Sequence, residues 1–117
     1  MTTDITRSNG NGRMSQIVEH GGILYLSGQV GNPQTSVVEQ TLEVLGKVDA
    51  LLQAAGTDKS RILSATIWLA DMTDFQAMNA VWDDWVIDGQ EPARACGEAK
   101  LAHADMRVEI MIIAAKA

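Results

Sequence analysis

The longest periodic segment of the chain, residues 37–55, limits most strongly what the sequence can fold into. It carries two series at helical spacing, apolar except for Asp49, with Ser36 and Glu39 in a capping-box arrangement at its start and Gly56 after it. The series are Val38, Leu42, Leu45, Asp49 and Leu52, and then Val37, Val44, Val48 and Leu51. A helix with so wide an apolar face needs a broad surface to pack against, and this predicts a β-sheet beneath it.

Strand-like segments precede this helix. We expect a strand at residues 14–19, a turn at Gly21 and Gly22, and a short apolar strand at residues 23–26. Residues 28–33 are rich in turn formers and are predicted to be a loop. The start of the chain, residues 1–13, is polar and rich in Gly and Asn, and the first strand is expected only after it.

The second half alternates between strand and helix. Residues 61–69 predict a strand, and a second capping-box pattern over 73–76 predicts a helix that Gly89 ends. One face of this helix carries Phe75, Met78, Trp82 and Trp85, which is more typical of core than of a ligand site. Residues 93–101 and 107–114 alternate with a period of two and predict the last strands.

The predicted order is therefore ββαβαββ in a single domain spanning residues 1–117. Strand–helix–strand connections favour crossovers, so we expect an α/β (α+β) fold with a mixed sheet and both helices on one face. Val108, Ile110 and Ile112 share one face of the last strand, and Glu109 shares the other with Met111 and Ile113, so the sheet face away from the helices also looks apolar. A bare apolar face on so small a domain predicts burial in an oligomer.

Composition excludes several classes of protein. The net charge of −6 argues against nucleic acid as the main partner, because phosphate binding needs a basic face. We expect no metal site, since Cys96 is the one cysteine and His20 and His103 stand apart near predicted turns. No signal peptide or membrane span is recognisable, and the lone cysteine fits a reducing compartment, so the expected location is the cytoplasm.

Three residues in the last two predicted strands are candidates for chemistry. Arg94 either forms a structural ion pair with one of fifteen acids or holds a ligand carboxylate at two points. Glu109 interrupts a strand of Val, Ile and Met, and is either the partner of Arg94 or a polarising acid. Cys96 shares a strand face with Arg94, and a small buried hydrophobe is its favoured interpretation because no His stands near it.

The second predicted helix and the last strands leave two further points open. Asn79 neighbours the aromatic helix face, as a polar cap or a site amide, whereas Asp83 and Asp84 are expected on a solvated face. If the last two strands form a simple hairpin, Arg94 and Glu109 lie about five residues apart, or roughly 16 Å at strand rise. They would then reach one site only across subunits.

Five short motifs occur in an order and spacing that resemble the Rid (YjgF-like) family. They are L-S-G-Q-V at 26–30, Q-T at 40–41, D-M-T-D-F at 71–75 with M-N at 78–79, P-A-R-A-C at 92–96 and V-E-I at 108–110. Together the resemblance covers about residues 13–114. The short loop after Gly31 and the absence of an L-P segment near Leu101 make the chain similar to the small YoaB-like bacterial branch of the family.

The resemblance implies a chorismate-mutase-like (YjgF-like) homotrimer with clefts between subunits, and no cofactor. Such proteins hydrolyse reactive 2-imino and enamine acids, such as 2-iminopropionate and 2-aminoacrylate, to 2-keto acids and ammonia. Residues matching Arg94 bind the carboxylate of this small anionic metabolite. Those matching Cys96, largely through its backbone, and Glu109 help to place a water, and those matching Ser27 and Asn79 lie at or near the pocket.

One position departs from the family pattern. Met14 stands where well-studied members carry a pocket Tyr, so one hydroxyl is missing from the substrate-binding residues. This departure keeps an alternative open, a non-catalytic trimeric binder or sensor of small carboxylates or keto acids. A third interpretation, another enzyme on a similar trimeric scaffold, would need more cationic residues in the cleft than Arg94 alone.

Overall fold

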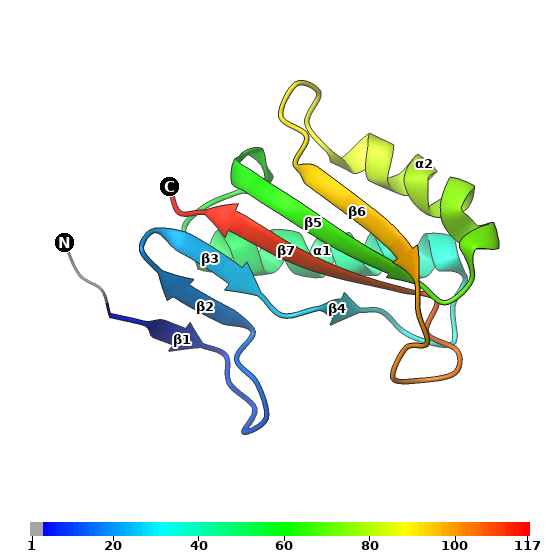
Figure 1. Ribbon diagram of the computed structural model, residues 1–117, viewed down its shortest axis with the longest axis horizontal. Helices are drawn as coiled ribbons and strands as arrows, with labels where there is room; N and C mark the ends of the chain where they lie inside the picture. The colour runs from blue at the N-terminus through cyan, green and yellow to red at the C-terminus, as the bar shows by residue number, and fades with distance from the viewer. Residues whose placement is uncertain (1–3) are drawn as a thin grey trace.

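The computed structural model describes residues 4–117 as one mixed sheet with two helices on one of its faces (Figure 1). The strands are β1 (Thr6–Ser8), β2 (Ile17–His20), β3 (Ile23–Leu26), β4 (Gln29–Val30), β5 (Ile62–Leu69), β6 (Ala93–Glu98) and β7 (Val108–Ala115). The helices are α1 (Val37–Ala54) and α2 (Phe75–Trp85). The predicted α+β class, with a mixed sheet covered on one face, is confirmed.

The sheet runs in the order β1-β2-β3-β7-β5-β6, and β4 also pairs with β7. Only the neighbours β5 and β6 are parallel; the other pairs that involve the described strands are antiparallel. The simple hairpin considered for the last two strands is wrong, because β5 lies between β6 and β7. β5 pairs with a strand on each of its two edges, in parallel with β6 and antiparallel with β7.

The core lies between the sheet and the helices. Val108, Ile110 and Ile112 of β7 are fully buried there and share one face of the strand, as its alternation predicts; the structure shows that this is the face toward the helices. On α1 the buried residues are Val37, Gln40, Thr41, Val44, Leu45, Val48 and Leu52. Three members of the first predicted series are exposed instead: Val38 by 40%, Leu42 by 58%, and Asp49. The face of α1 is therefore rotated toward Gln40 and Thr41, two polar residues that periodicity alone could not place in the core.

Local capping explains where α1 begins and ends. The Ser36 hydroxyl accepts a hydrogen bond from the Glu39 N–H, and Gly56 after the helix has a φ of +79°. The second capping box is wrong, because Asp74 caps α2 without a side-chain bond and Asp71 instead caps a short 3-10 turn before it. This helix also ends before Gly89. Neither α1 nor α2 nor any other described helix is long and apolar enough to cross a membrane.

Two short strands are not predicted by the sequence. β1 is wholly exposed and pairs with β2, and the predicted loop over 28–33 contains the two-residue β4. Neither segment shows the period-two alternation that predicts a strand, because one is an edge without a buried face and the other is too short.

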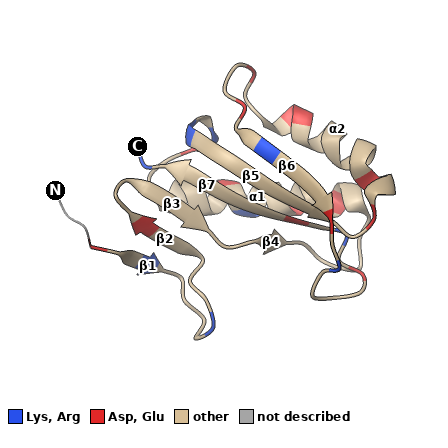
Figure 2. Cartoon of the chain, viewed as in Figure 1, with Lys and Arg blue, Asp and Glu red and all other residues tan. Residues whose placement is uncertain are grey.

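The face of the sheet away from the helices is open and apolar in the single chain. Tyr25, Trp68 and Met111 are 43%, 39% and 40% exposed on β3, β5 and β7. Neither β3 nor β5 carries a charged residue, and both are tan in Figure 2. Gly97 on the small side of β6 lies against the Trp68 ring, where an added Cβ would stand 3.3 Å from Cζ3. Exposed aromatic and methionine side chains gathered on one sheet face favour burial against another molecule.

Candidate functional site

Arg94 lies on β6, an edge strand of the sheet, and points toward α2. Its Nη1 donates a hydrogen bond of 2.8 Å to Asn79 Oδ1, and its Cζ stands 5.4 Å from the Trp82 ring centroid. The register pairs Arg94 with Ala65 of β5, which faces the core. A neutral amide and an aromatic face thus fix the side chain without neutralising its charge.

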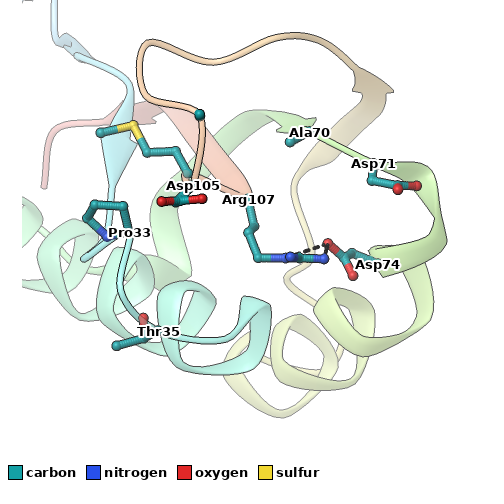
Figure 3. A pocket seen from close by; sticks show the side chains of 9 residues that line it. Pro33, Thr35, Ala70, Asp71, Asp74, Asp105 and Arg107 are labelled. Atoms are coloured by element: carbon teal, nitrogen blue, oxygen red, sulfur yellow. Dashed lines mark hydrogen bonds and ion pairs between the residues drawn. The ribbon is translucent and has the colours of Figure 1, made fainter.

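The structural ion-pair interpretation of Arg94 finds no support among residues 4–117, where no salt bridge includes it. Arg107 provides the contrast. It lines a pocket of about 280 Å³ with Asp71 and Asp105, and its guanidinium is bound to Asp74 at 2.7 and 2.9 Å (Figure 3). That pocket holds none of the predicted site residues, and its one cation is already paired, so we give it no role in anion binding.

Cys96 follows Arg94 on the same face of β6 and packs partly buried against the core. Burial raises the pKa of its thiol, and the nearby Arg94 charge offsets this only in part. The thiol is therefore neutral near pH 7, which fits the small-hydrophobe interpretation. The outer edge of β6 has no strand neighbour among the described residues, so backbone groups there can bind water or a ligand.

We expect Cys96 to react slowly with iodoacetamide at neutral pH. The thiolate is the reactive form, and the raised pKa reduces its population below that of an ordinary cysteine. The rate of alkylation of the folded protein should therefore lie below that of the urea-unfolded chain at the same pH. An equal or faster rate for the folded protein would show an activated thiol and would reopen a nucleophilic role.

Glu109 lies on β7 but on the open face of the sheet, opposite Trp68 of β5 in the register. Its carboxylate stands directly over the Gly28 backbone, and a Cβ on Gly28 would overlap it. Gly28 is thus required by a close approach. The next residue back, Ser27, donates its hydroxyl hydrogen to the Ser15 carbonyl at 2.6 Å. We refer to Ser15, Ser27, Gly28 and Glu109 as the Ser27–Glu109 cluster.

Met14 lies in the loop between β1 and β2, and its side chain is exposed by 46%. It precedes Ser15, so the bond between Ser15 and Ser27 keeps Met14 at the border of the Ser27–Glu109 cluster. The loop itself is fixed by Asn11, whose side-chain oxygen accepts the backbone N–H of both Arg13 and Met14.

The predicted site residues therefore form two groups within one chain. Arg94, Cys96 and Asn79 lie on the helix side of the sheet, whereas Glu109 lies on the other side with Ser27 and Met14 near it. Glu109 is not the ion-pair partner of Arg94, because the alternation of strands places the two on opposite faces. Residues on opposite faces of one sheet can surround a single ligand only when a second copy of the chain contributes one of the two groups.

Two contributors are not found from the sequence. Trp82, predicted to lie in the core, is buried to 5% exposure yet also supports the Arg94 guanidinium. Gly28 has the pattern of a turn residue, whereas it makes room for a carboxylate. In the sequence, the contact between Gly28 and Glu109 is indicated only by the order and spacing of the S-G-Q and V-E-I motifs. Among residues 4–117, no three His, Cys, Asp or Glu side chains are grouped so that they could hold a metal ion.

Comparison with known proteins gives a consistent set of relatives. The model of the family described as endoribonuclease L-PSP matches residues 5–116. A RutC family protein of Haemophilus ducreyi is 44% identical over 95% of this chain and 96% of its own, and the RutC family protein YoaB of Escherichia coli K12 is 43% identical over 95% and 97%. A crystal structure of a YjgF family member from Neisseria meningitidis has a TM-score of 0.96 at 44% identity, covering 98% and 97% of the two chains.

Proposed function

Because this chain belongs to the endoribonuclease L-PSP family, which includes the RutC and YjgF proteins, we propose that it hydrolyses small 2-imino acids to 2-keto acids and ammonia. Membership confirms the resemblance found in the sequence, and the similarity to YoaB supports placing the chain in that branch. The activity itself is inferred from the site residues and from their chemistry. We propose that it takes place in the cytoplasm.

The observation that carries the proposal is the uncommitted charge of Arg94. Its one hydrogen bond among the described residues goes to an amide, and four of its five N–H groups remain to bind a carboxylate. A charge-assisted hydrogen bond contributes roughly 1.5–3 kcal/mol. The carboxylate of a 2-imino acid is the only anionic group that such a substrate must carry, so one bidentate contact can orient it.

The chemical step requires only a positioned water and a group that transfers protons. The imine nitrogen of R–C(=NH2+)–COO− is protonated, so the carbon bonded to it is electrophilic. Water adds to this carbon, and departure of ammonia leaves R–CO–COO− and NH4+. We assign Glu109 and the Ser27 hydroxyl of the same cluster to hold this water. Glu109 accepts a proton as the water adds and returns it to the nitrogen, and the hydroxyl proton of the adduct leaves with the ammonia as NH4+. Backbone groups at the outer edge of β6 near Cys96 would orient the same water. The gain comes from placing reactants and from proton transfer.

We further propose that the site is completed in a homotrimer. The two groups of site residues lie on opposite faces of one sheet, so a single chain does not bring them around one substrate. The open apolar face with Tyr25, Trp68 and Met111 supplies the surface that copies of this chain would bury.

Met111→Glu is expected to dissociate this assembly. A carboxylate at the centre of the apolar face would lose its hydration on assembly without gaining a partner. Light scattering should give three times the chain mass of 12.6 kDa for the natural protein and one chain mass for the variant. Met111→Leu, which keeps the residue apolar, should retain the trimer. A glutamate variant that stays trimeric would exclude this face as the interface.

The proposed activity is tested with 2-iminopropionate made in place by an amino acid oxidase from alanine. Disappearance of the imine is followed by trapping with semicarbazide, with and without the protein. The protein should accelerate hydrolysis well above the spontaneous rate. If the protein does not raise the rate above spontaneous hydrolysis for this or for bulkier 2-imino acids, the hydrolase proposal is wrong.

A trimeric binder or sensor of small carboxylates is the second candidate, because Met14 replaces the pocket hydroxyl. It would bind pyruvate through Arg94 without turning over the imine. RNA cleavage, the activity in the name of the family, has weaker support. The net charge is −6, and Arg107, the cation of the acidic pocket in Figure 3, is already paired with Asp74.

A further inference from the structure

We propose that Arg7 and Arg13 form a second anion-binding subsite, which makes the preferred substrates 2-imino acids with a second, distal carboxylate. The inference rests on the proposed function, since it names the substrate class of that site. Arg94 would hold the carboxylate beside the imine, and Arg7 and Arg13 of a neighbouring subunit would hold the distal one.

Arg7 and Arg13 line one shallow, open hollow of about 400 Å³ between β1 and the loop that follows it. Figure 2 shows basic residues on both segments. Met14, Ser15 and Val18 also line it, and no acidic side chain is among the described lining residues. A hollow with two guanidinium groups and no carboxylate attracts an anion, which is unexpected in a chain with a net charge of −6.

The other cations show how unusual this pairing is. Within residues 4–117, six of the nine Lys and Arg side chains contact a carboxylate, a carbonyl, an amide or an aromatic ring. Those six are Lys47, Lys59, Arg61, Arg94, Arg107 and Lys116. Arg7 and Arg13 are two of the remaining three, and both face the same hollow.

The backbone under Arg13 is held in place. Asn11 Oδ1 accepts the N–H groups of Arg13 and Met14, each at 2.9 Å, and the Asn11 N–H donates to the Met14 carbonyl at 3.0 Å. Gly12 takes the left-handed conformation that this turn needs, with φ at +87°. Arg7 is anchored separately, in β1, opposite Val18. Two ordered segments thus present the two cations, and this lowers the entropy lost on binding.

The hollow adjoins the Ser27–Glu109 cluster. Ser15 lines the hollow, and its carbonyl oxygen accepts the Ser27 hydroxyl. A substrate held beside Ser27 therefore needs only a short extension to reach Arg13. Met14 lines the hollow and precedes Ser15, so it borders both regions and places Arg13 next to this end of the site. Five-carbon dicarboxylates such as 2-iminoglutarate match this chemistry.

The test compares binding of two unreactive product analogues, 2-oxoglutarate and 2-oxopentanoate, by calorimetry on the assembled protein. Both have five carbons, and only the first has a distal carboxylate. We expect 2-oxoglutarate to bind at least about tenfold more tightly, as a charge-assisted contact implies. Arg7→Gln and Arg13→Gln should each reduce that ratio, and the double variant should bring it near one. Lys59→Gln, which removes the same charge far from the hollow, is the matched control and should keep the ratio.

A wild-type ratio near one would overturn the subsite, as would a ratio that survives in the double variant or falls equally in Lys59→Gln. Failure to bind either keto acid would overturn it as well. Turnover of 2-iminopropionate, measured separately, distinguishes the two proposals. If turnover is absent and the affinity ratio is large, the hydrolase proposal is wrong and the subsite is supported. If turnover is present and the ratio is near one, the hydrolase proposal is supported and the subsite is wrong.

Discussion

Replacing Arg94 with Ala is expected to lower kcat/KM for 2-iminopropionate hydrolysis by about 100-fold while the protein stays folded and assembled. The variant lacks the two-point contact to the carboxylate, which contributes roughly 1.5–3 kcal/mol, and with it the orientation of the imine carbon. Stability should fall by only about 1 kcal/mol, since Arg94 makes one hydrogen bond to the Asn79 amide and packs over the Trp82 ring. Imine trapping and urea unfolding measure the two effects.

Arg94→Lys separates charge from shape. Lysine keeps the positive charge but lacks the planar fork, so most of the loss should persist. Asn79→Ala leaves the guanidinium and removes the bond that fixes it, and we expect a smaller loss, of a few fold. If Arg94→Ala unfolds the chain or dissociates the assembly, the residue is structural. If it leaves hydrolysis unchanged, another cation binds the carboxylate.

Much of the fold is predictable because residues buried on one face of a helix or strand recur at a regular spacing in the sequence. β7 alternates strictly, and the sequence correctly divides its side chains between two faces, while the structure shows which face is buried. The rotation of α1 about its axis is not predictable in this way, because Gln40 and Thr41 are fully buried polar residues while Val38 and Leu42 face outward. Apolar periodicity does not identify a buried polar side chain whose hydrogen bonds are satisfied inside the protein.

The site is predictable in its members but not in its arrangement. Arg94 and Cys96 share a strand face whatever that strand pairs with, so their proximity follows from the spacing alone. The relation of Arg94 to Glu109 depends on which strand lies between β6 and β7, and that is a tertiary fact. The approach of Gly28 to Glu109 likewise joins segments far apart in the chain, which no local pattern records.

Gln40→Met is expected to lower the free energy of unfolding by about 3 kcal/mol. The Gln40 side chain is fully buried, and its Nε2 donates to the Thr35 and Asp105 carbonyls while its Oε1 accepts the Arg107 N–H. Methionine fills a similar volume but leaves three backbone groups without partners, each of which costs about 1–3 kcal/mol when buried. The lower end applies, because Thr35, Asp105 and Arg107 border the pocket in Figure 3, where water can reach them.

The neighbouring Thr41 is the matched control. It is equally buried, but its hydroxyl bonds the Val37 carbonyl within its own helix, so Thr41→Val should lose less than about 1 kcal/mol. Urea unfolding of both variants at one protein concentration measures the difference. Equal losses would mean that packing, and not the three bonds of Gln40, dominates here. A larger loss for Gln40→Met would show that this side chain ties α1 to the segment leading into β7, and so to the placement of Glu109.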